Sequence, residues 1–386
     1  MLELINKCIN SKFRIYFINS KFKNLTSKFI LTKNPQLPNT IISSSKPMKK
    51  SNINFELLKQ MCNVFAPTGN EAPMKEFVLN YIKENQKHWK VQPQIIEGED
   101  FQDCLILVFG KPRTAAFSHF DSIGFMARYD NHLVRIGSPK YEDGYVLVGK
   151  DSQGQIEGTL KVKYGNENEK DKKKKKKNKK KKRGSRQHRK PLGEVKLQLE
   201  FDRTVDVGTE FVFKQDFKET EDYVQSCYMD DRLGCWNLLK TAETLENGIL
   251  AFSCYEEIGG GTMPFLLKWM WENYKIKQCL ISDITWITEG VKHGEGVAVS
   301  MRDRNIPRRS FLNKIIDLVK ESGINYQLEV ENDGGSDAKE IQSSAYPMDW
   351  CFIGAAEDNV HSPTEKVHKD DIKAMTDVYA YLMEKL

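Results

Sequence analysis

Five residues far apart in the chain have side chains of the types that bind divalent metal ions, and each lies at the end of an apolar segment. They are His119, Asp230, Glu257, Asp283 and His361. Ligand sites in open α/β sheets collect at the carboxyl ends of the strands, so we expect these side chains to converge. Imidazole and carboxylate ligands mixed in one site are typical of zinc. The set therefore predicts metal-assisted chemistry.

Two adjacent glutamates, Glu256 and Glu257, are the sharpest local signal. They follow the apolar run Ile249–Tyr255 and precede three glycines, Gly259–Gly261. Charged side chains directly after a buried strand are costly unless they meet a positive group, and neighbouring residues at a strand end point to opposite sides. We therefore expect one glutamate to bind metal and the other to exchange protons with a water molecule. An ordinary helix start is the alternative.

Two further positions become stronger candidates for metal binding when they are considered with this pair. His119 is followed two residues later by Asp121, and a carboxylate there can hold the second nitrogen of a metal-binding imidazole. Asp230 and Asp231 are adjacent, and a carboxylate with two free oxygens can bridge two ions that lie about 3.5–4 Å apart. Each position alone also fits an ordinary structural role, but the ordered set favours a site with two metals.

Strand and helix patterns alternate through most of the chain. Apolar runs predict buried strands at Cys104–Gly110, Thr114–Phe120, Ile249–Tyr255, Gln278–Ile284, Tyr326–Val330 and Trp350–Ile353, and helical spacing predicts helices at Leu233–Leu245, Met263–Tyr274, Phe311–Ser322, Asp337–Ser344 and from Asp370 onward. Such alternation predicts an α/β fold with a mostly parallel central sheet and helices on both faces.

A stretch of different texture interrupts this pattern. Residues 131–221 contain short, β-branched segments punctuated by glycine, which predicts an inserted small β-barrel-like domain between two parts of the α/β domain, 54–130 and 222–386. Ten of the twelve residues 171–182 are lysine. Like charges at this density repel, so we expect a disordered Lys-rich loop over 166–190. It is either a low-complexity expansion at a hairpin tip or an address for a polyanion.

The net charge of +6 conceals an acidic body. Residues 1–50 carry +9 and residues 161–190 carry +14, which leaves −17 for the rest of the chain. An acidic body argues against nucleic acid as the substrate. The sequence contains no run of 18 apolar residues, so we expect no membrane span. The eight cysteines form no CxxC pair, which favours reduced, buried thiols.

The first 53 residues form a basic, acid-poor extension without the apolar core of a secretory signal. It has features of a mitochondrial transit peptide, and the alternative is a disordered extension with Met48 as a second start. We therefore expect the protein in the cytoplasm or the mitochondrial matrix and not outside the cell.

Several motifs together resemble one family. APTGNE, SHFDSIGF, MDDRLG, YEEIGGG, the GGSDA segment Gly334–Ala338 and VHSPTEKV are similar to those of the co-catalytic zinc aminopeptidases of the tetrahedral, glutamyl-aminopeptidase type. The resemblance covers residues 54–386 apart from the lysine tract. The chain departs from the family pattern at Ser122, where an acid is usual, and at Asn359-Val360, where an aromatic residue is usual before the last histidine.

The resemblance implies a set of roles. His119 and Asp283 would bind one ion, Asp230 would bridge, Glu257 and His361 would complete the second site, and Glu256 would be the general base. It also implies two divalent ions per subunit, zinc before cobalt or manganese. Short peptides would be the substrates, and the inserted domain would mediate homo-oligomer assembly, with no need for a membrane or nucleic acid.

Other functions stay open at this level. An N-acyl amino acid deacylase or a carboxypeptidase would use the same metal centre, with Arg128, Arg302 or His293 clamping a free carboxylate. A catalytically silent assembly or binding protein is the alternative of another class, although the full ligand set argues against it. No G-x-S-x-G motif occurs, so a serine hydrolase of that type has no support.

Overall fold

The computed structural model describes residues 53–164 and 195–386 of the chain. The basic extension up to residue 52 and the Lys-rich loop 166–190, with the features expected of them, lie outside the described residues. Across the described part, no helix combines the length and the apolar character that a membrane span requires.

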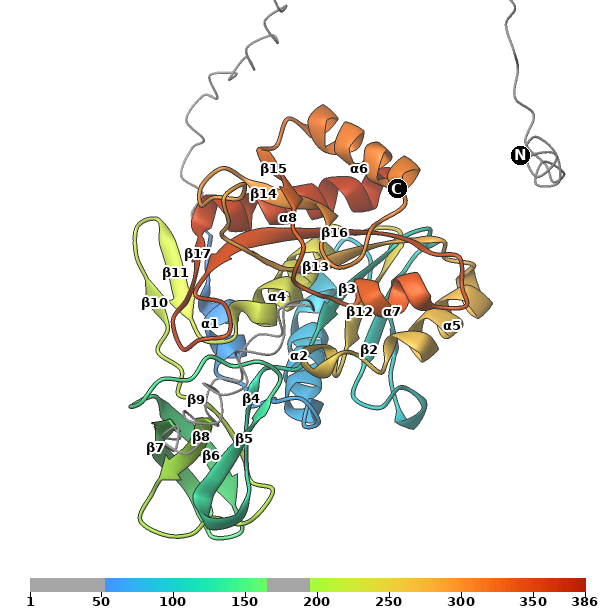
Figure 1. Cartoon of the computed structure of the whole chain (residues 1–386). Coiled ribbons are helices and arrows are strands. Elements are labelled where there is room, and N and C mark those ends of the chain that lie inside the picture. The colour runs from blue at the N-terminus through green and yellow to red at the C-terminus, as the bar shows by residue number, and fades with distance from the viewer. Residues whose placement is uncertain (1–52, 165–194) are drawn as a thin grey trace, which may run out of the picture. The chain divides into compact units, whose positions relative to one another are not determined.

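A mixed sheet of eleven strands forms the main body (Figure 1). The strand order is β1-β2-β12-β3-β13-β16-β17-β11-β10, and β14 pairs with both β15 and β16. The strands are β1 (Gln94–Ile96), β2 (Leu105–Phe109), β3 (Ala115–His119), β10 (Lys218–Glu219), β11 (Tyr223–Ser226), β12 (Gly248–Ser253), β13 (Gln278–Trp286), β14 (Val297–Arg302), β15 (Tyr326–Val330), β16 (Asp349–Asp358) and β17 (Glu365–His368).

The four central strands β12, β3, β13 and β16 are parallel, as the alternating pattern predicted. Both flanks are antiparallel, so the sheet as a whole is mixed rather than mostly parallel. For the pairs β1–β2, β10–β11 and β16–β17 the reason is local, because these strands follow one another in the chain and a short loop can join only antiparallel neighbours. β16 and β17 are connected in this way, and the loop between them carries His361.

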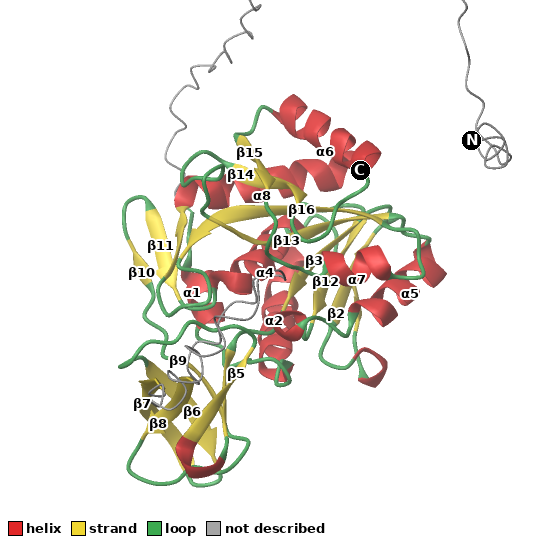
Figure 2. Ribbon diagram, in the orientation of Figure 1, coloured by secondary structure: helices red, strands yellow, loops and turns green. Residues whose placement is uncertain are grey.

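Helices lie on both faces of the sheet, which confirms the predicted fold class (Figure 2). α4 contacts α1 and α8 and packs on β3 and β13, whereas α5 and α7 contact each other on the other face. The helices are α1 (Glu56–Cys62), α2 (Ala72–Asn85), α4 (Met229–Ala242), α5 (Met263–Tyr274), α6 (Arg309–Ser322), α7 (Ala338–Ser343) and α8 (Lys369–Lys385). One large apolar core joins these layers.

A second, smaller core fills a closed antiparallel barrel with the strand order β4-β5-β8-β7-β6-β9. Its strands are β4 (Gly124–Ala127), β5 (His132–Ile136), β6 (Val146–Asp151), β7 (Gly154–Tyr164), β8 (Val195–Glu200) and β9 (Glu210–Phe213). The barrel begins earlier than the expected boundary at residue 131, because Phe125 and Ala127 of β4 are buried in its core. β10, expected inside the insertion, pairs with β11 of the main sheet instead.

The register of β7 and β8 makes a prediction about the lysine tract. These strands are antiparallel partners up to Tyr164 and Val195, so the two residues that flank the segment 165–194 are direct neighbours. Replacing the segment by Asn-Gly, a two-residue hairpin turn, should leave the fold intact. Loop closure costs about 0.6 kcal/mol per doubling of length, so the free energy of unfolding in urea should be unchanged or higher by up to about 2 kcal/mol. An insoluble or markedly less stable product would show that the segment contributes to the fold.

Candidate metal centre

Three parallel strands place the predicted ligands at one edge of the sheet. His119 is the last residue of β3, and its register partner on β12 is Ser253. Glu256 and Glu257 follow on a single 3₁₀ turn after β12, and not on the strand end itself. Asp283 was expected to end its strand but lies inside β13, which continues to Trp286 because it stays paired with β16.

Asp230 lies between the two histidines. Its Oδ1 is 3.2 Å from His119 Nε2, and its Oδ2 is 3.1 Å from His361 Nε2. The residue lies at the start of α4 with non-helical backbone angles, and its peptide bond to Asp231 is cis. One carboxylate thus offers a separate oxygen to each side of the site, as a ligand that bridges two ions must.

Two groups of three residues share this carboxylate. His119, Asp230 and Asp283 form one group, and Asp230, Glu257 and His361 form the other, with the candidate ligand atoms of each group within 4.8 Å of one another. Glu257 Oε2 lies 3.4 Å from His361 Nε2. The second oxygen of Glu257 is buried and has no hydrogen-bond partner among the described residues. A buried acceptor without a donor is costly, and a cation at this position would satisfy it.

The charges at the site also favour cations. Burial, and after it the charge of Asp230, raises the pKa of Asp283 to about 8. Burial and the same neighbour raise the pKa of Glu257 well above its usual range. Burial opposes the ionisation of Asp230 too, but hydrogen bonds with His119 and His361 outweigh it and hold its pKa well below the usual range. Buried carboxylates at this density are typical of a site that binds divalent metal.

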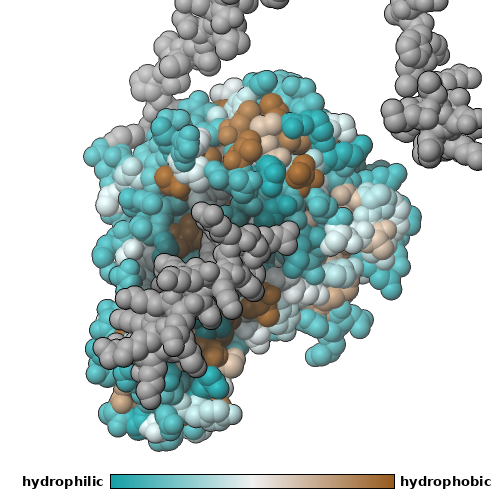
Figure 3. Space-filling view, viewed as in Figure 1, coloured by the Kyte–Doolittle hydropathy of each residue, from teal (hydrophilic) through white to brown (hydrophobic). Residues whose placement is uncertain are grey.

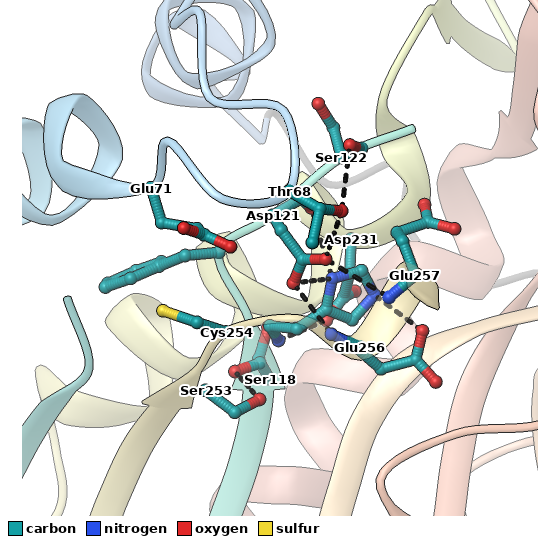
Figure 4. Close-up of polar contacts among 12 residues, drawn as sticks. Thr68, Glu71, Ser118, Asp121, Ser122, Asp231, Ser253, Cys254, Glu256 and Glu257 are labelled. Atoms are coloured by element: carbon teal, nitrogen blue, oxygen red, sulfur yellow. Dashed lines mark hydrogen bonds and ion pairs between the residues drawn. The ribbon is translucent and has the colours of Figure 1, made fainter. Parts of the chain in front are cut away.

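Asp121 is fully buried and holds both the histidine and the glutamate turn (Figure 4). His119 Nδ1 lies 3.1 Å from the backbone carbonyl of Asp121 and 3.4 Å from its Oδ1, and these contacts orient the imidazole so that Nε2 faces Asp230. The same carboxylate accepts the backbone N–H groups of Glu256 and Glu257, each at 3.1 Å. Figure 4 shows the side chains of the two glutamates leaving this turn in different directions. Asp121 therefore fixes the geometry of the last residue of β3 and of the turn that follows β12.

Asp231 differs from Asp230 in that both of its carboxylate oxygens accept hydrogen bonds from neighbouring residues. Its Oδ2 accepts Ser118 Oγ at 2.5 Å and the N–H of His119 at 3.2 Å, and its Oδ1 accepts the N–H of Gly234 at 2.9 Å. The family resemblance implied the bridging role for Asp230 and gave no role to Asp231. The donors around Asp231 identify Asp230 as the carboxylate that remains available.

Several supporting residues were not found from the sequence. Thr68 donates to Asp121 Oδ2 at 2.8 Å. Glu365 accepts the backbone N–H of His361 at 2.8 Å and that of Asp230 at 3.4 Å. Ser138, just after barrel strand β5, places its Oγ 2.8 Å from His361 Nδ1. Thr68 and Glu365 belong to the motifs APTGNE and VHSPTEKV, whereas Ser138 belongs to none. The sequence did not show their contacts, because these join segments that are distant in the chain.

Ser122, where the chain departs from the family pattern, faces away from the ligands. Its hydroxyl donates to the carbonyl of Ala66 at 3.2 Å, and its own carbonyl accepts the N–H of Thr68 at 3.1 Å. Ser122 therefore ties the loop of Thr68 to the strand end that carries His119. The departure leaves the candidate ligands in place.

A cavity of about 600 Å³ opens beside the centre. Glu256, 17% exposed, lines it together with four of the candidate ligands, and His119 lies beneath. The segment Gly334–Asp337 forms part of the wall, as expected from the sequence. Among the described residues that line the cavity, Arg128, Arg302 and His293 do not appear, so the cations proposed as carboxylate clamps lie elsewhere.

Comparisons with known proteins point to one family. The family model described as M42 glutamyl aminopeptidase matches residues 107–378. A protein of Acetivibrio thermocellus with a provisional aminopeptidase assignment is 26% identical over 336 residues, which cover 82% of this chain and 94% of that protein. An aminopeptidase of the archaeon Desulfurococcus kamchatkensis has a similar fold, with a TM-score of 0.68, 18% identity and coverage of 86% of this chain and 94% of that one. The TET1 peptidase of Pyrococcus horikoshii also has a similar fold, with a TM-score of 0.66, 20% identity and coverage of 86% of this chain and 99% of that one.

Replacing the shared carboxylate should damage both ion sites together. Asp230→Asn replaces one of the two carboxylate oxygens by an amide nitrogen and removes one negative charge from the site. Changes to residues that only support metal ligands typically lower metal affinity about 10–100-fold, and we expect a larger loss of affinity for divalent ions here. Calorimetric titration of metal-free protein with Zn²⁺ measures the effect, and Asp317→Asn on the exposed face of α6 is the matched control. Unchanged affinity in the Asp230 variant would contradict a bridging role.

The hydrogen bonds that Glu365 accepts lead to a separate prediction, with a smaller expected loss of metal affinity. Glu365→Gln keeps the volume but leaves one acceptor oxygen for two backbone N–H groups, those of His361 and Asp230. We expect a loss of about tenfold in Zn²⁺ affinity, at the lower end of outer-sphere effects, with the melting temperature close to that of the parent. An affinity equal to the parent's would show that the two ligands hold their positions without Glu365.

Proposed function

Because the chain belongs to the M42 glutamyl aminopeptidase family and is thus a peptide-bond hydrolase, we propose that it removes N-terminal residues from short peptides with the help of two divalent metal ions. The observation that carries this proposal is Asp230, which lies within 3.2 Å of two histidines and is shared by both ligand groups. Such a carboxylate has the geometry of a ligand common to two ions.

The donor set fits zinc. His119, Asp230 and Asp283 would hold one ion, and Asp230, Glu257 and His361 the other. Two bound ions supply a water of lowered pKa and polarise the carbonyl of the bond to be broken. The unpartnered oxygen of Glu257 supports the fit, because its burial leaves no other compensation among the described residues.

Glu256 is the residue placed to move protons. It lines the cavity, and its Oε2 lies 4.0 Å from His119 Nε2, beside the ligands but outside both ligand groups. Its carboxylate would take a proton from the attacking water, whose oxygen bonds to the carbonyl carbon. As the carbon–nitrogen bond breaks, the same proton passes to the leaving amine. The hydrogen bond from its backbone N–H to Asp121 holds Glu256 in this position.

The inserted barrel is the proposed assembly surface. The TET1 peptidase of Pyrococcus horikoshii, similar in fold, assembles into a tetrahedron or an octahedral shell. In this chain the barrel exposes large hydrophobic side chains, including Tyr129 and Val207, each more than 60% exposed. Apolar groups on the surface of a small domain favour contacts with another copy, so we extend the proposal to a homo-oligomer formed through the barrel.

A deacylase or carboxypeptidase on the same centre is the competing function. It would need a cation that clamps a free carboxylate, and Arg304, exposed at the cavity, is the residue that favours it. A panel of aminoacyl-anilides and N-acetylated amino acids separates the two functions. Metal-dependent hydrolysis of the free-amine anilides alone supports the proposed aminopeptidase. Hydrolysis of the acylated compounds alone would move the function to deacylation.

Removing the proton-transfer group should slow the chemistry without emptying the site. Glu256→Gln should lower kcat for aminoacyl-anilides by about 10²–10⁴-fold, the usual contribution of general acid–base catalysis. Zinc stoichiometry, measured by elemental analysis, should stay at the parent value, because Glu256 belongs to neither ligand group. If kcat falls by less than tenfold, Glu256 is not the base. If zinc content falls along with it, Glu256 acts as a ligand.

A further inference from the structure

The part of the cavity beyond the metal centre is strongly acidic. Apart from the candidate ligands and Glu256, six carboxylates line it, namely Asp303, Glu329, Glu331, Asp333, Asp337 and Glu340, against two cations, Arg304 and Lys339. Lys339 is directed to the carbonyl of Gly259 at 3.3 Å. Arg304 is exposed and makes no ion pair within the part of the chain that the structure describes. The cavity wall therefore carries excess negative charge.

Two of these carboxylates are buried without a counter-ion. Asp303 is 9% exposed and Glu329 is 5% exposed, and neither forms an ion pair among the described residues. Arg302 is the cation nearest in sequence to Asp303, and its Nε donates to the backbone carbonyl of Asp303 at 3.0 Å and not to the carboxylate. Glu329 accepts the hydroxyl of Thr285, and Asp303 accepts the backbone N–H of Asn305. Burial raises the pKa of both groups. Keeping two carboxylates close together in this state is costly unless something positive arrives from outside.

The burial of Glu329 follows from the orientation of its strand, β15. On this strand Glu329 and Gln327 face inward, whereas Leu328 and Val330 are 42% and 62% exposed. Figure 3 shows the resulting hydrophobic patch on the surface over β14, β15 and α6. A strand that exposes its apolar side chains to bury a glutamate breaks the usual pattern, and such violations concentrate at functional sites.

Asp337 is independent evidence that a ligand enters the cavity. It lines the cavity and is 4% exposed, and its carboxylate can only accept hydrogen bonds. Its Oδ2 accepts Ser253 Oγ at 2.6 Å, but its Oδ1 has no hydrogen-bond partner among the described residues. A buried acceptor left without a donor indicates that a group carrying N–H or a positive charge completes the site.

The distance from the metal centre suits a long side chain. Asp283 and Thr285 are two residues apart on β13, so they face the same side about 6.5 Å from each other. Thr285 in turn donates to Glu329. An extended lysine or arginine side chain spans a comparable length. Trp286, 41% exposed, adds an aromatic ring to the cavity wall, and such rings attract cations.

We propose that the cavity selects peptides whose N-terminal residue is lysine or arginine, with Asp303 and Glu329 receiving the cationic end of that side chain. The inference rests on the proposed aminopeptidase function and names its substrate class. An N-terminal glutamate, which the family's description suggests, would meet the same two carboxylates and be repelled.

The test compares three anilides, those of lysine, norleucine and glutamate. Norleucine matches the carbon chain of lysine without its ammonium group. The zinc-loaded full chain should cleave the lysine anilide with a kcat/KM at least tenfold above that of the norleucine anilide, and the glutamate anilide most slowly. In the double variant Asp303→Asn/Glu329→Gln, the lysine-to-norleucine ratio should fall at least tenfold. Asp317→Asn, which removes one carboxylate charge on the outer face of α6, should keep the parent ratio.

A second measurement keeps this inference separate from the proposed function. Calorimetric binding of L-lysinamide and L-norleucinamide to the parent and the double variant reports the preference of the cavity even if no anilide is cleaved. Hydrolysis of none of the anilides would overturn the aminopeptidase proposal. A parent that binds or cleaves the norleucine compound as well as the lysine compound would overturn the selectivity, and so would a ratio that the double variant leaves unchanged. Thermal unfolding of both variants shows whether they are folded.

Discussion

The accumulation of buried carboxylates around Asp230 is the constraint on which the rest of the structure depends. Asp283, Glu256 and Glu257 meet it at the carboxyl edge of β12, β3 and β13, where parallel strands bring their ends together. Like charges at this density would destabilise the folded chain if nothing positive shared the site. The two histidines lie nearest to Asp230, one at each of its oxygens, and His361 also lies 3.4 Å from Glu257 Oε2. The fold thus concentrates negative charge where metal ions can neutralise it.

The acids of the site divide into two kinds according to their donors. Asp121, Asp231 and Glu365 accept backbone N–H groups from neighbouring strands and loops, so their oxygens are occupied by the fold itself. Glu257 keeps a buried oxygen with no partner among the described residues. Oxygens of the first kind hold ligands in position, and oxygens of the second kind are available to bind an ion. This distinction is invisible in residue type, because both kinds are aspartates and glutamates beside one another in sequence.

The barrel is more than an appendage to the α/β body. Ser138, after β5, contacts the imidazole of His361, and the N–H of Lys140 donates to the carbonyl of the same histidine at 2.8 Å. His361 itself has a positive φ of 64°, an uncommon conformation for a residue other than glycine, so contacts on both sides must hold it. One candidate ligand is therefore held by contacts with the barrel insertion as well as with the α/β body, and the insertion and the candidate site are parts of one structure.

The sequence by itself determined the fold class, the helix Met263–Tyr274, the strand Tyr326–Val330 and the residues that gather at the sheet edge, because apolar periodicity and strand-end chemistry are local signals. Tertiary structure alone decided which donors occupy Asp231, that Glu256 and Glu257 lie on a 3₁₀ turn, and that Thr68 and Glu365 support the site. It also decided the antiparallel flanks and the inward turn of Glu329. The physical reason is that these outcomes depend on hydrogen bonds between segments far apart in the chain, whose donors no local pattern reveals.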